Sequence, residues 1–494
     1  MSVIGNRVKA VWVNRSKLLS DPENGTVVYG SVGNDEEGNI YTVGTMIGEA
    51  KFGQFVLNTT ENTPTPFITK QNQCGEFIYA VAGTVTGGSV SGGISKLKKL
   101  GEELFGSVFE NVANPAALGV TISVDDGLYI GGSFIGDLEF NGVRLSNQSG
   151  GNMLYVVKLN KDNGEAIWGN ATMNVSGDLR VVGMTADDQS LYLTGRFIGE
   201  INFGTAMINS DSTNFYVTKI NKKRGKFIWA SQSSETNVEA VVNGVDLYIR
   251  NNVLYSVGSF FISAQFGSTE ELVSLSTDAF VVAINSCNGD FIKAVQTKTA
   301  NGNSSVNGMA IIGSSGEIFI TGYFGGEVAF GKMILTSPTG IFAVTFISKL
   351  NKYLEWVETV AGDAVISGAS VDFNAAGSIG LDDKYVYVAG IFIGNSKFGN
   401  IDPLISVPNR AFFLVRLSRR LKFDTAFQST NLNLDGSQNF LPNKGLTVVD
   451  DNIVVCLGVY TGSTRVGQLL VESDIAIHIG DSGQNVWVAQ LQIL

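Results

Sequence analysis

The chain has 494 residues, and with 34 Lys or Arg against 45 Asp or Glu its formal net charge at pH 7 is −11. A charge of this sign repels phosphate backbones and anionic lipids, so nucleic acid and membrane surfaces are poor candidate partners. Three cysteines in so long a chain argue against a disulfide framework, and no apolar run reaches the roughly 18 residues of a membrane-spanning helix. Residues 1–13 lack the apolar core and cleavage site of a secretory signal, so we expect a protein of the cytoplasm or of an assembled particle.

A repeating unit runs along almost the whole chain. Its clearest copy reads Leu-Tyr-Leu-Thr-Gly-Arg-Phe-Ile-Gly-Glu-Ile-Asn-Phe-Gly at 191–204, and one glycine marks the register of every copy. The marking glycines are Gly44, Gly132, Gly195, Gly258, Gly322, Gly390 and Gly458. The steps between them are 88, 63, 63, 64, 68 and 68 residues. Because one such unit cannot bury both its faces alone, the repeat predicts a ring of small sheets.

The first element in chain order is a predicted strand at 7–16. Its sequence matches 225–233, the outer strand of a later repeat, whereas the last repeat stops after a third strand at 485–491. We therefore expect residues 7–16 to supply the missing fourth strand of the last repeat. This pairing would close the ring and remove an open sheet edge that invites aggregation.

Each repeat is predicted to form one blade of four antiparallel strands. In the fourth copy the alternation of apolar residues places the strands at 241–249, 254–260, 278–284 and 291–295. The fold class is therefore all-β, a seven-bladed β-propeller in a single domain over 1–494. The predicted blades cover 27–82, 117–171, 178–234, 238–298, 305–362, 369–429 and 444–494, with 83–116 as an insertion.

The insertion at 83–116 explains why the first step exceeds the others by 20 to 25 residues. A Gly- and Ser-rich run at 83–93, expected to be flexible, leads into a predicted helix whose apolar residues recur at helical spacing. The apolar stripe consists of Ile94, Leu97, Leu100, Leu104, Phe105, Val108, Phe109 and Val112. This stripe is the candidate partner-binding site, because it must be buried either on its own propeller or in a partner or second copy.

The repeat also resembles a known family. The pattern Gly-x-Phe-x-Gly-x-x-x-Phe-Gly, followed by Phe-Val-x-Lys-Leu-Asn-x-x-Gly-x-x-x-Trp-Ala, is best matched at 128–168 and 191–230. It is similar to the bacterial β-propeller repeat family labelled SBBP, over nearly the whole chain outside 83–116. The resemblance implies a scaffold or surface module without shared catalytic residues. Similar repeats occur in proteins of large DNA viruses, so it is compatible with a component of a virion.

The turns between first and second strands are acidic in several copies, as at Asp35, Asp187-Asp188 and Asp382-Asp383. Paired carboxylates could hold calcium, but Asp also initiates tight turns by binding its own backbone. Because Asn251-Asn252 takes the same place in another copy, we favour the turn role. Lysines at 158, 219 and 349 near the neighbouring turns are expected to lie on a solvated face in weak ion pairs with these acids.

Four tryptophans, Trp12, Trp168, Trp229 and Trp356, are predicted to occupy equivalent places in outer strands. An aromatic arc could bind sugars by stacking. Repetition at one structural position favours packing between neighbouring blades instead, since an aromatic ring buries a large area there.

The inventory for catalysis is small. His478 is the only histidine, which excludes His-based triads and multi-histidine metal sites, and a Cys-rich zinc site lacks its ligands. We predict no catalytic residue, no metal and no cofactor, and expect a non-catalytic structural or interaction scaffold that binds a protein partner or itself. The alternative is a carbohydrate-binding or carbohydrate-active propeller, since two carboxylates in the central channel could act without histidine. Convergent Asp, Glu and Tyr in the channel would favour it, and a Gly, Val and Ser lining would count against it.

Overall fold

The computed structural model describes residues 8–19, 25–59, 63–87, 121–124, 127–147, 149–234, 237–365, 372–431, 438–440, 444–461, 463–472 and 485–494. Every regular element within these ranges is a β-strand. The predicted helix at 94–112, with the whole apolar stripe from Ile94 to Val112, lies outside the described residues. No helix in the described ranges is long and apolar enough to cross a membrane.

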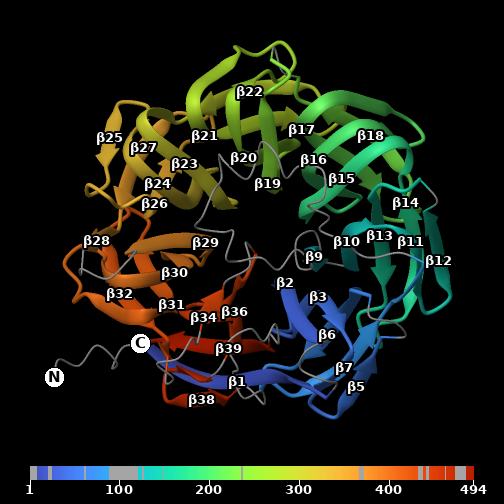
Figure 1. The fold of residues 1–494 in the computed structure, drawn as a ribbon, viewed down its shortest axis with the longest axis horizontal. Coiled ribbons are helices and arrows are strands. Elements are labelled where there is room, and N and C mark those ends of the chain that lie inside the picture. Colours follow the sequence, from blue (N-terminus) through green and yellow to red (C-terminus); the bar gives the residue numbers. More distant parts are fainter. Residues whose placement is uncertain are drawn as a thin grey trace.

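Most strands belong to antiparallel sheets of four or five strands that lie around a central axis, the architecture of a β-propeller (Figure 1). In each sheet the strands follow one another in chain order from the axis outwards (Figure 1). Six sheets share this order, and the main strands of the first two are β2 (Thr26–Asn34), β3 (Ile40–Ile47), β6 (Thr65–Gln71) and β7 (Phe77–Ala82), and then β9 (Thr121–Val124), β10 (Leu128–Phe134), β13 (Met153–Leu159) and β14 (Ala166–Ala171). The third and fourth sheets consist of β15 (Met173–Ala186), β16 (Ser190–Asn202), β17 (Met207–Asn221) and β18 (Phe227–Gln232), and then of β19 (Val241–Arg250), β20 (Val253–Ala264), β21 (Leu272–Asn285) and β22 (Phe291–Gln296). The main strands of the fifth and sixth are β23 (Lys298–Ile311), β24 (Ile318–Phe330), β26 (Val344–Leu350) and β27 (Trp356–Ala361), and then β29 (Phe373–Leu381), β30 (Tyr385–Lys397), β31 (Leu404–Ser418) and β32 (Phe423–Gln428). The strands predicted for the fourth copy are confirmed, although β20 and β21 continue beyond them into a longer hairpin.

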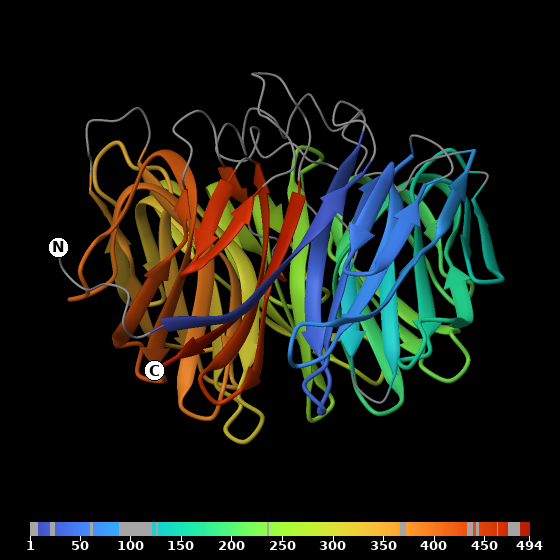
Figure 2. The same cartoon turned by 90° about the horizontal axis from the view of Figure 1, so that it is seen from below.

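A further sheet contains both ends of the chain. Besides β4 (Glu49–Phe52) and β5 (Phe55–Asn58), which extend the sheet beyond β1, its strands are β34 (Gln438–Phe440), β35 (Leu446–Asp450), β36 (Ile453–Thr461), β39 (Asn485–Ile493) and β1 (Val8–Leu18). β1 runs antiparallel to β39, from Val8 opposite Ile493 to Arg15 opposite Trp487. This is the pairing expected from the sequence match of residues 7–16, and Figure 2 shows β1 crossing the outer wall.

The segments that join successive sheets also form strands. They leave the outer edge of one sheet and pair with the extended second strand, or the hairpin, of the next. Examples are β8 (Thr84–Thr86) on β11 (Gly136–Phe140), β28 (Asp363–Val365) on β30, and β33 (Thr430–Asn431) on β37 (Ser463–Val466). The expected flexibility of 83–93 is therefore wrong for 84–86, because a pairing partner far along the chain overrides local Gly-rich composition. The remaining strands are β12 (Val143–Asn147), β25 (Met333–Thr336) and β38 (Leu469–Glu472).

The glycine that marks each repeat has a steric reason. A Cβ on Gly195 would lie 1.9 Å from the backbone oxygen of Arg180, and a Cβ on Gly258 would lie 1.9 Å from that of Asn243. Arg180 and Asn243 each precede a β-bulge in the first strand of their sheet, where the backbones of the first and second strands approach closely. The repeated glycine is therefore required by the way the first and second strands pair.

The core lies between the sheets. Apolar residues on the facing sides of β13 and β16, such as Leu154 and Leu191, belong to one fully buried cluster. The same arrangement recurs from sheet to sheet. Because both faces of a sheet are therefore covered by its neighbours, the middle of its strands carries apolar residues on both faces.

A glutamine at the end of the outer strand forms a clasp, a pair of hydrogen bonds from its side-chain amide to the backbone of one residue in the third strand. The sequence pattern does not predict it. Gln296 accepts a hydrogen bond from the backbone N–H of Val273 at 3.1 Å and donates one to its carbonyl oxygen at 2.9 Å. Gln232 and Gln428 bind Asn209 and Ile405 in the same way. The side-chain amide thereby takes the place of a neighbouring strand at the exposed sheet edge.

We expect Gln296→Ala to lower the free energy of unfolding by about 0.5–1.5 kcal/mol, because two hydrogen bonds to the backbone are replaced by water. Urea denaturation followed by circular dichroism measures the change. Gln54→Ala is the matched control, since Gln54 is exposed and its side chain makes no hydrogen bond within the described residues. Equal stability of the two variants would contradict the clasp.

Candidate functional site

The turn between the third and fourth strands of one sheet is held by side chains of the preceding sheet. Trp168 donates from Nε1 to the carbonyl oxygen of Lys222 at 3.2 Å, and Trp229 donates to that of Ser286 at 3.3 Å. Trp12 does the same with Gln73 at 2.9 Å. These side chains therefore pack and bond between sheets, which confirms the packing role predicted for these three tryptophans.

A glycine in each bound turn makes room for the indole ring. Gly225 has a φ of +66°, and a Cβ on it would lie 2.6 Å from the ring of Trp168. Gly289 and Gly75 lie in the same way against Trp229 and Trp12. The left-handed backbone and the close ring both favour glycine at this position.

Trp356 does not share this position, so its predicted equivalence is wrong. In the strand register, Trp356 lies opposite Leu350. The equivalent pair in the third sheet is Phe227 opposite Ile220, so Trp356 is equivalent to Phe227 and not to Trp229. The reason is a turn with one residue fewer between the third and fourth strands of its sheet. The ring of Trp356 instead packs edge-on against Phe330, with 5.4 Å between the ring centres.

Lysines of the third strands bind the same turns. The ammonium groups of Lys70, Lys219 and Lys349 donate to carbonyl oxygens of the next sheet. The acceptors are Lys161, Ser286 and Arg419, at 3.1, 2.9 and 3.3 Å. Lys70 and Lys349 are only 7% and 8% exposed. The solvated face predicted for Lys349 is therefore wrong, because the neighbouring sheet supplies hydrogen-bond acceptors in place of water.

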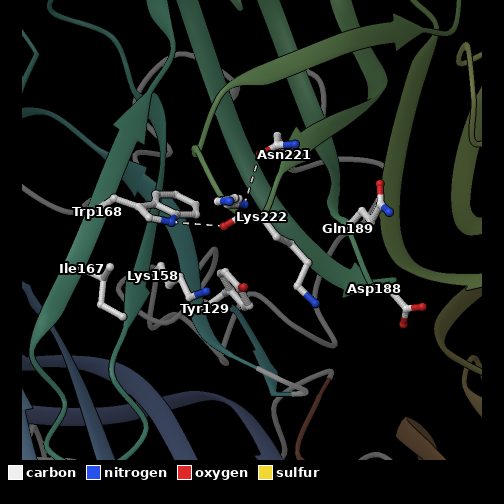
Figure 3. Close-up of a pocket in the computed structure, with 9 residues that line it drawn as sticks. Tyr129, Lys158, Ile167, Trp168, Asp188, Gln189, Asn221 and Lys222 are labelled. Carbon is white, nitrogen blue, oxygen red and sulfur yellow. Dashed lines mark hydrogen bonds between the residues drawn. The ribbon is translucent and has the colours of Figure 1, made fainter.

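The joint between the sheets of β14 and β18, where side chains of one sheet hold the turn of the next, contains a cavity of about 480 Å³ (Figure 3). The residues that line it come from both sheets. They are Tyr129, Lys158, Ile167, Trp168, Asp188, Gln189, Asn221, Lys222 and Lys223. Three lysines and one carboxylate make this lining positive in a chain whose net charge is −11.

Two ammonium groups flank one aromatic ring in this cavity. Lys158 Nζ lies 5.2 Å and Lys222 Nζ lies 5.6 Å from the centre of the Tyr129 ring, within the range of cation–π attraction. Lys222 also donates to the carbonyl oxygen of Asp187 at 2.9 Å. Lys158 occupies the position of Lys219, since each lies opposite the tryptophan of its sheet. Unlike Lys219, the Lys158 ammonium makes no hydrogen bond to any residue that the structure describes.

A second cavity, of about 490 Å³, lies between the sheets of β22 and β26 but has a different chemistry. Ala283 and Lys293 stand there in the places of Lys158 and Trp168. The ammonium of Lys293 donates to the carbonyl oxygen of Tyr353 at 2.8 Å. The combination of an unbonded lysine and a tryptophan is thus absent from this second cavity.

The acidic turns are held by their own backbone, as predicted. Asp187 accepts from the backbone N–H of Gln189 and Ser190 at 2.9 and 2.7 Å, and its second oxygen accepts from the Tyr192 hydroxyl at 2.7 Å. Asp35 and Asp382 are bound in the same pattern. Among the described residues, no group of three His, Cys, Asp or Glu is placed to hold a metal ion.

The hydrogen bonds to Asp382 change its acidity. Burial by itself raises the pKa of this carboxyl, but hydrogen bonds from the Tyr387 hydroxyl and from the backbone of Lys384, Tyr385 and Asn452 together bring the pKa below its ordinary value. A carboxyl with a lower pKa in the folded than in the unfolded state stabilises the fold above its unfolded pKa of about 4. That stability is lost as the pH falls through the folded pKa.

We therefore expect Asp382→Asn to be less stable than the parent protein at neutral pH, and the difference to shrink as the pH falls below about 4. Denaturant titrations at neutral and acid pH measure it. Asp383→Asn, which changes an exposed neighbour, is the control. A deficit that stays constant with pH would show that the Asp382 charge plays no part.

An ion pair crosses the centre of the ring. Lys444 precedes β35, which pairs with β36, and its Nζ lies 2.7 Å from Oδ1 of Asp246 on β19, although Figure 1 places β19 and β36 on opposite sides of the ring. The same ammonium donates to the carbonyl oxygen of Met184 at 3.1 Å, and the Lys444 backbone bridges to Ser31. The second oxygen of Asp246 accepts from the backbone N–H of Met309 at 3.1 Å. Sequence reasoning missed this pair, since nothing local distinguishes Lys444 or Asp246.

The structure does not test the predicted partner-binding stripe, because Ile94 to Val112 lie outside the described residues. Cys74 and Cys287 are exposed and Cys456 is buried, and all three are free thiols. Burial raises the pKa of the Cys456 thiol. None of these three cysteines lines the cavity beside Lys158 and Trp168.

No protein-family model matches the chain, and no curated protein sequence does. Among solved structures, it is similar to the quinohemoprotein alcohol dehydrogenase of Comamonas testosteroni, with 9% identity, a TM-score of 0.41 and coverage of 98% of this chain and 76% of that one. A Synechocystis apocarotenoid oxygenase variant has 10% identity, a TM-score of 0.39 and coverage of 96% and 95%. A protein of unknown function from Dyadobacter fermentans has 10% identity, a TM-score of 0.35 and coverage of 99% of both chains. At this level of likeness none of their activities carries over, and the resemblance to SBBP repeats stays a prediction.

Proposed function

We propose that the chain forms a closed, seven-bladed β-propeller that serves as a non-catalytic scaffold for protein binding, as part of a larger assembly such as a virion. The seven repeats support the blade count, and the pairing of β1 with β39 supports closure. We further propose that this assembly is cytoplasmic.

The observation that carries this proposal is the repeated bonding between sheets. Tryptophan and lysine side chains of one sheet hold the turn of the next, and Lys444 with Asp246 joins sheets across the axis. These polar groups hold the sheets in place by hydrogen bonds made within the protein. A rigid ring of this kind suits a protein that presents loops to a partner.

The rival proposal is a propeller that binds or cleaves carbohydrate in its central channel. Asp246, an acid of the inner strand β19, is paired with Lys444 and bound by a backbone N–H. Other residues of the described inner strands include Ser31, Gly308 and Ser378, and the acid Asp178 on β15 accepts a hydrogen bond from the backbone N–H of Asn152 at 3.0 Å. Small residues and a neutralised carboxylate favour the scaffold over acid–base chemistry there.

Deleting residues 1–16 tests closure. The deletion removes most of the strand that pairs with β39, so we expect loss of the cooperative thermal transition seen by calorimetry. An unchanged transition would rule out the closed ring.

Purification from the native source, with identification of the chains that co-purify, tests the scaffold. Deleting residues 86–112 then separates the two roles of the insertion. Loss of assembly with a preserved thermal transition would indicate docking into a partner, whereas loss of thermal stability alone would indicate packing on the propeller. Binding on a glycan array by a protein that co-purifies with no partner would favour the carbohydrate proposal.

A further inference from the structure

We propose that the cavity between β14 and β18 binds a small ligand in which a ring-shaped body carries one anionic group, such as a carboxylate or a phosphate. The site goes beyond the scaffold proposal and does not depend on it. It lies at the joint between two sheets, away from the Lys444–Asp246 ion pair at the centre of the ring.

The charge of the cavity favours an anion. Three lysines, Lys158, Lys222 and Lys223, line the cavity together with one acidic residue, Asp188. Lys222 is only 4% exposed, so its charge is weakly screened by solvent. A local positive field on an otherwise acidic protein attracts a small anion and repels cations.

Lys158 supplies a donor that has no hydrogen-bond partner in the described part of the chain. In the next joint, Lys219 and Trp229 both donate to the carbonyl oxygen of Ser286. In this joint only Trp168 donates to the corresponding oxygen, that of Lys222. The Lys158 ammonium lies over the Tyr129 ring instead, partly exposed at the cavity, where it can donate to an anionic oxygen.

The walls of the cavity suit a ring-shaped body. The rings of Tyr129 and Trp168 lie with their centres 6.1 Å apart and their planes at 49°, and the adjoining Ile167 is 56% exposed. A volume of about 480 Å³ is within the range of small-ligand pockets. Aromatic and aliphatic walls with a few convergent charges are the usual composition of such sites.

Isothermal titration calorimetry of the full chain tests the site with three anions and their neutral counterparts. The pairs are glucuronate with glucose, benzoate with benzyl alcohol, and adenosine monophosphate with adenosine. We expect at least one anion to bind about tenfold or more tightly than its neutral counterpart, and weaker binding as salt is raised. The pair that responds identifies the source of the anion as a sugar acid, an aromatic acid or a nucleotide.

Lys158→Gln is expected to weaken that binding at least about tenfold with only a small change in the thermal transition, because the ammonium makes no hydrogen bond within the described protein and loses only its contact with the Tyr129 ring. The matched variant Lys219→Gln breaks a joint and should lose stability while keeping the affinity. Should Lys158→Gln fail to fold, Lys223→Gln, at an exposed lining residue, should still weaken binding several-fold. The proposal is overturned if no anion binds below about 10 mM, if neutral counterparts bind equally well, or if Lys158→Gln and Lys223→Gln keep full affinity.

Discussion

Replacing Gly258 with alanine is expected to lower the free energy of unfolding by more than about 3 kcal/mol, or to prevent folding altogether. The new Cβ would lie 1.9 Å from the backbone oxygen of Asn243 and 2.5 Å from the ring of Phe280. Neither neighbour can move without cost, because Asn243 belongs to the β19–β20 ladder beside a bulge and Phe280 is fully buried.

Thermal and urea denaturation of purified protein measure this effect. Gly313→Ala is the matched control, since no heavy atom lies within 4 Å of its added Cβ. We expect the control to stay within about 1 kcal/mol of the parent protein. If Gly258→Ala were as stable as Gly313→Ala, the steric account of the repeated glycine would be wrong.

Replacing Lys444 with methionine is expected to cost about 3–5 kcal/mol, because the Asp246 carboxylate is left without its ionic partner near the centre of the ring. The side chains of Lys444 and Asp246 are only 20% and 10% exposed, and Oδ1 lies 2.7 Å from the ammonium. The loss of the hydrogen bond to the Met184 carbonyl oxygen adds to the effect.

The double variant Lys444→Met with Asp246→Asn should recover part of the lost stability, because no uncompensated charge remains. Lys384→Met is the control. Its pair with Asp451 is exposed at 69% and 51%, with 3.8 Å between the charged atoms, so we expect a change below about 1 kcal/mol. Equal effects of Lys444→Met and Lys384→Met would contradict a stabilising role for the Lys444–Asp246 ion pair.

Both expected results concern how the sheets are held relative to one another. Gly258 sets the pairing of two strands within a sheet, and Lys444 connects sheets on opposite sides of the ring. The tryptophan and lysine joints act between neighbours. The stability of the molecule therefore depends on contacts within a sheet, between neighbouring sheets and across the ring.

The strands of each repeat could be predicted from the sequence because their signal is local. Alternation of apolar residues placed 241–249 and 291–295 within one or two residues of β19 and β22. The match of 7–16 to an outer strand likewise indicated the partner of β1. The equivalence of Trp356 failed because a one-residue difference in a turn changes the register, and sequence spacing alone does not show which residues face each other.

The sequence by itself determined the repeat, its alternation and its turn chemistry, since each depends on residues within a few positions of one another. Only the tertiary structure decided which polar groups meet. Lys444 and the oxygen it binds on Met184 are 260 residues apart, and Trp168 and Lys222 are 54 apart. The cavity beside Lys158 likewise forms where two sheets come together, and the lysine left unbonded in it has no local signature in the chain.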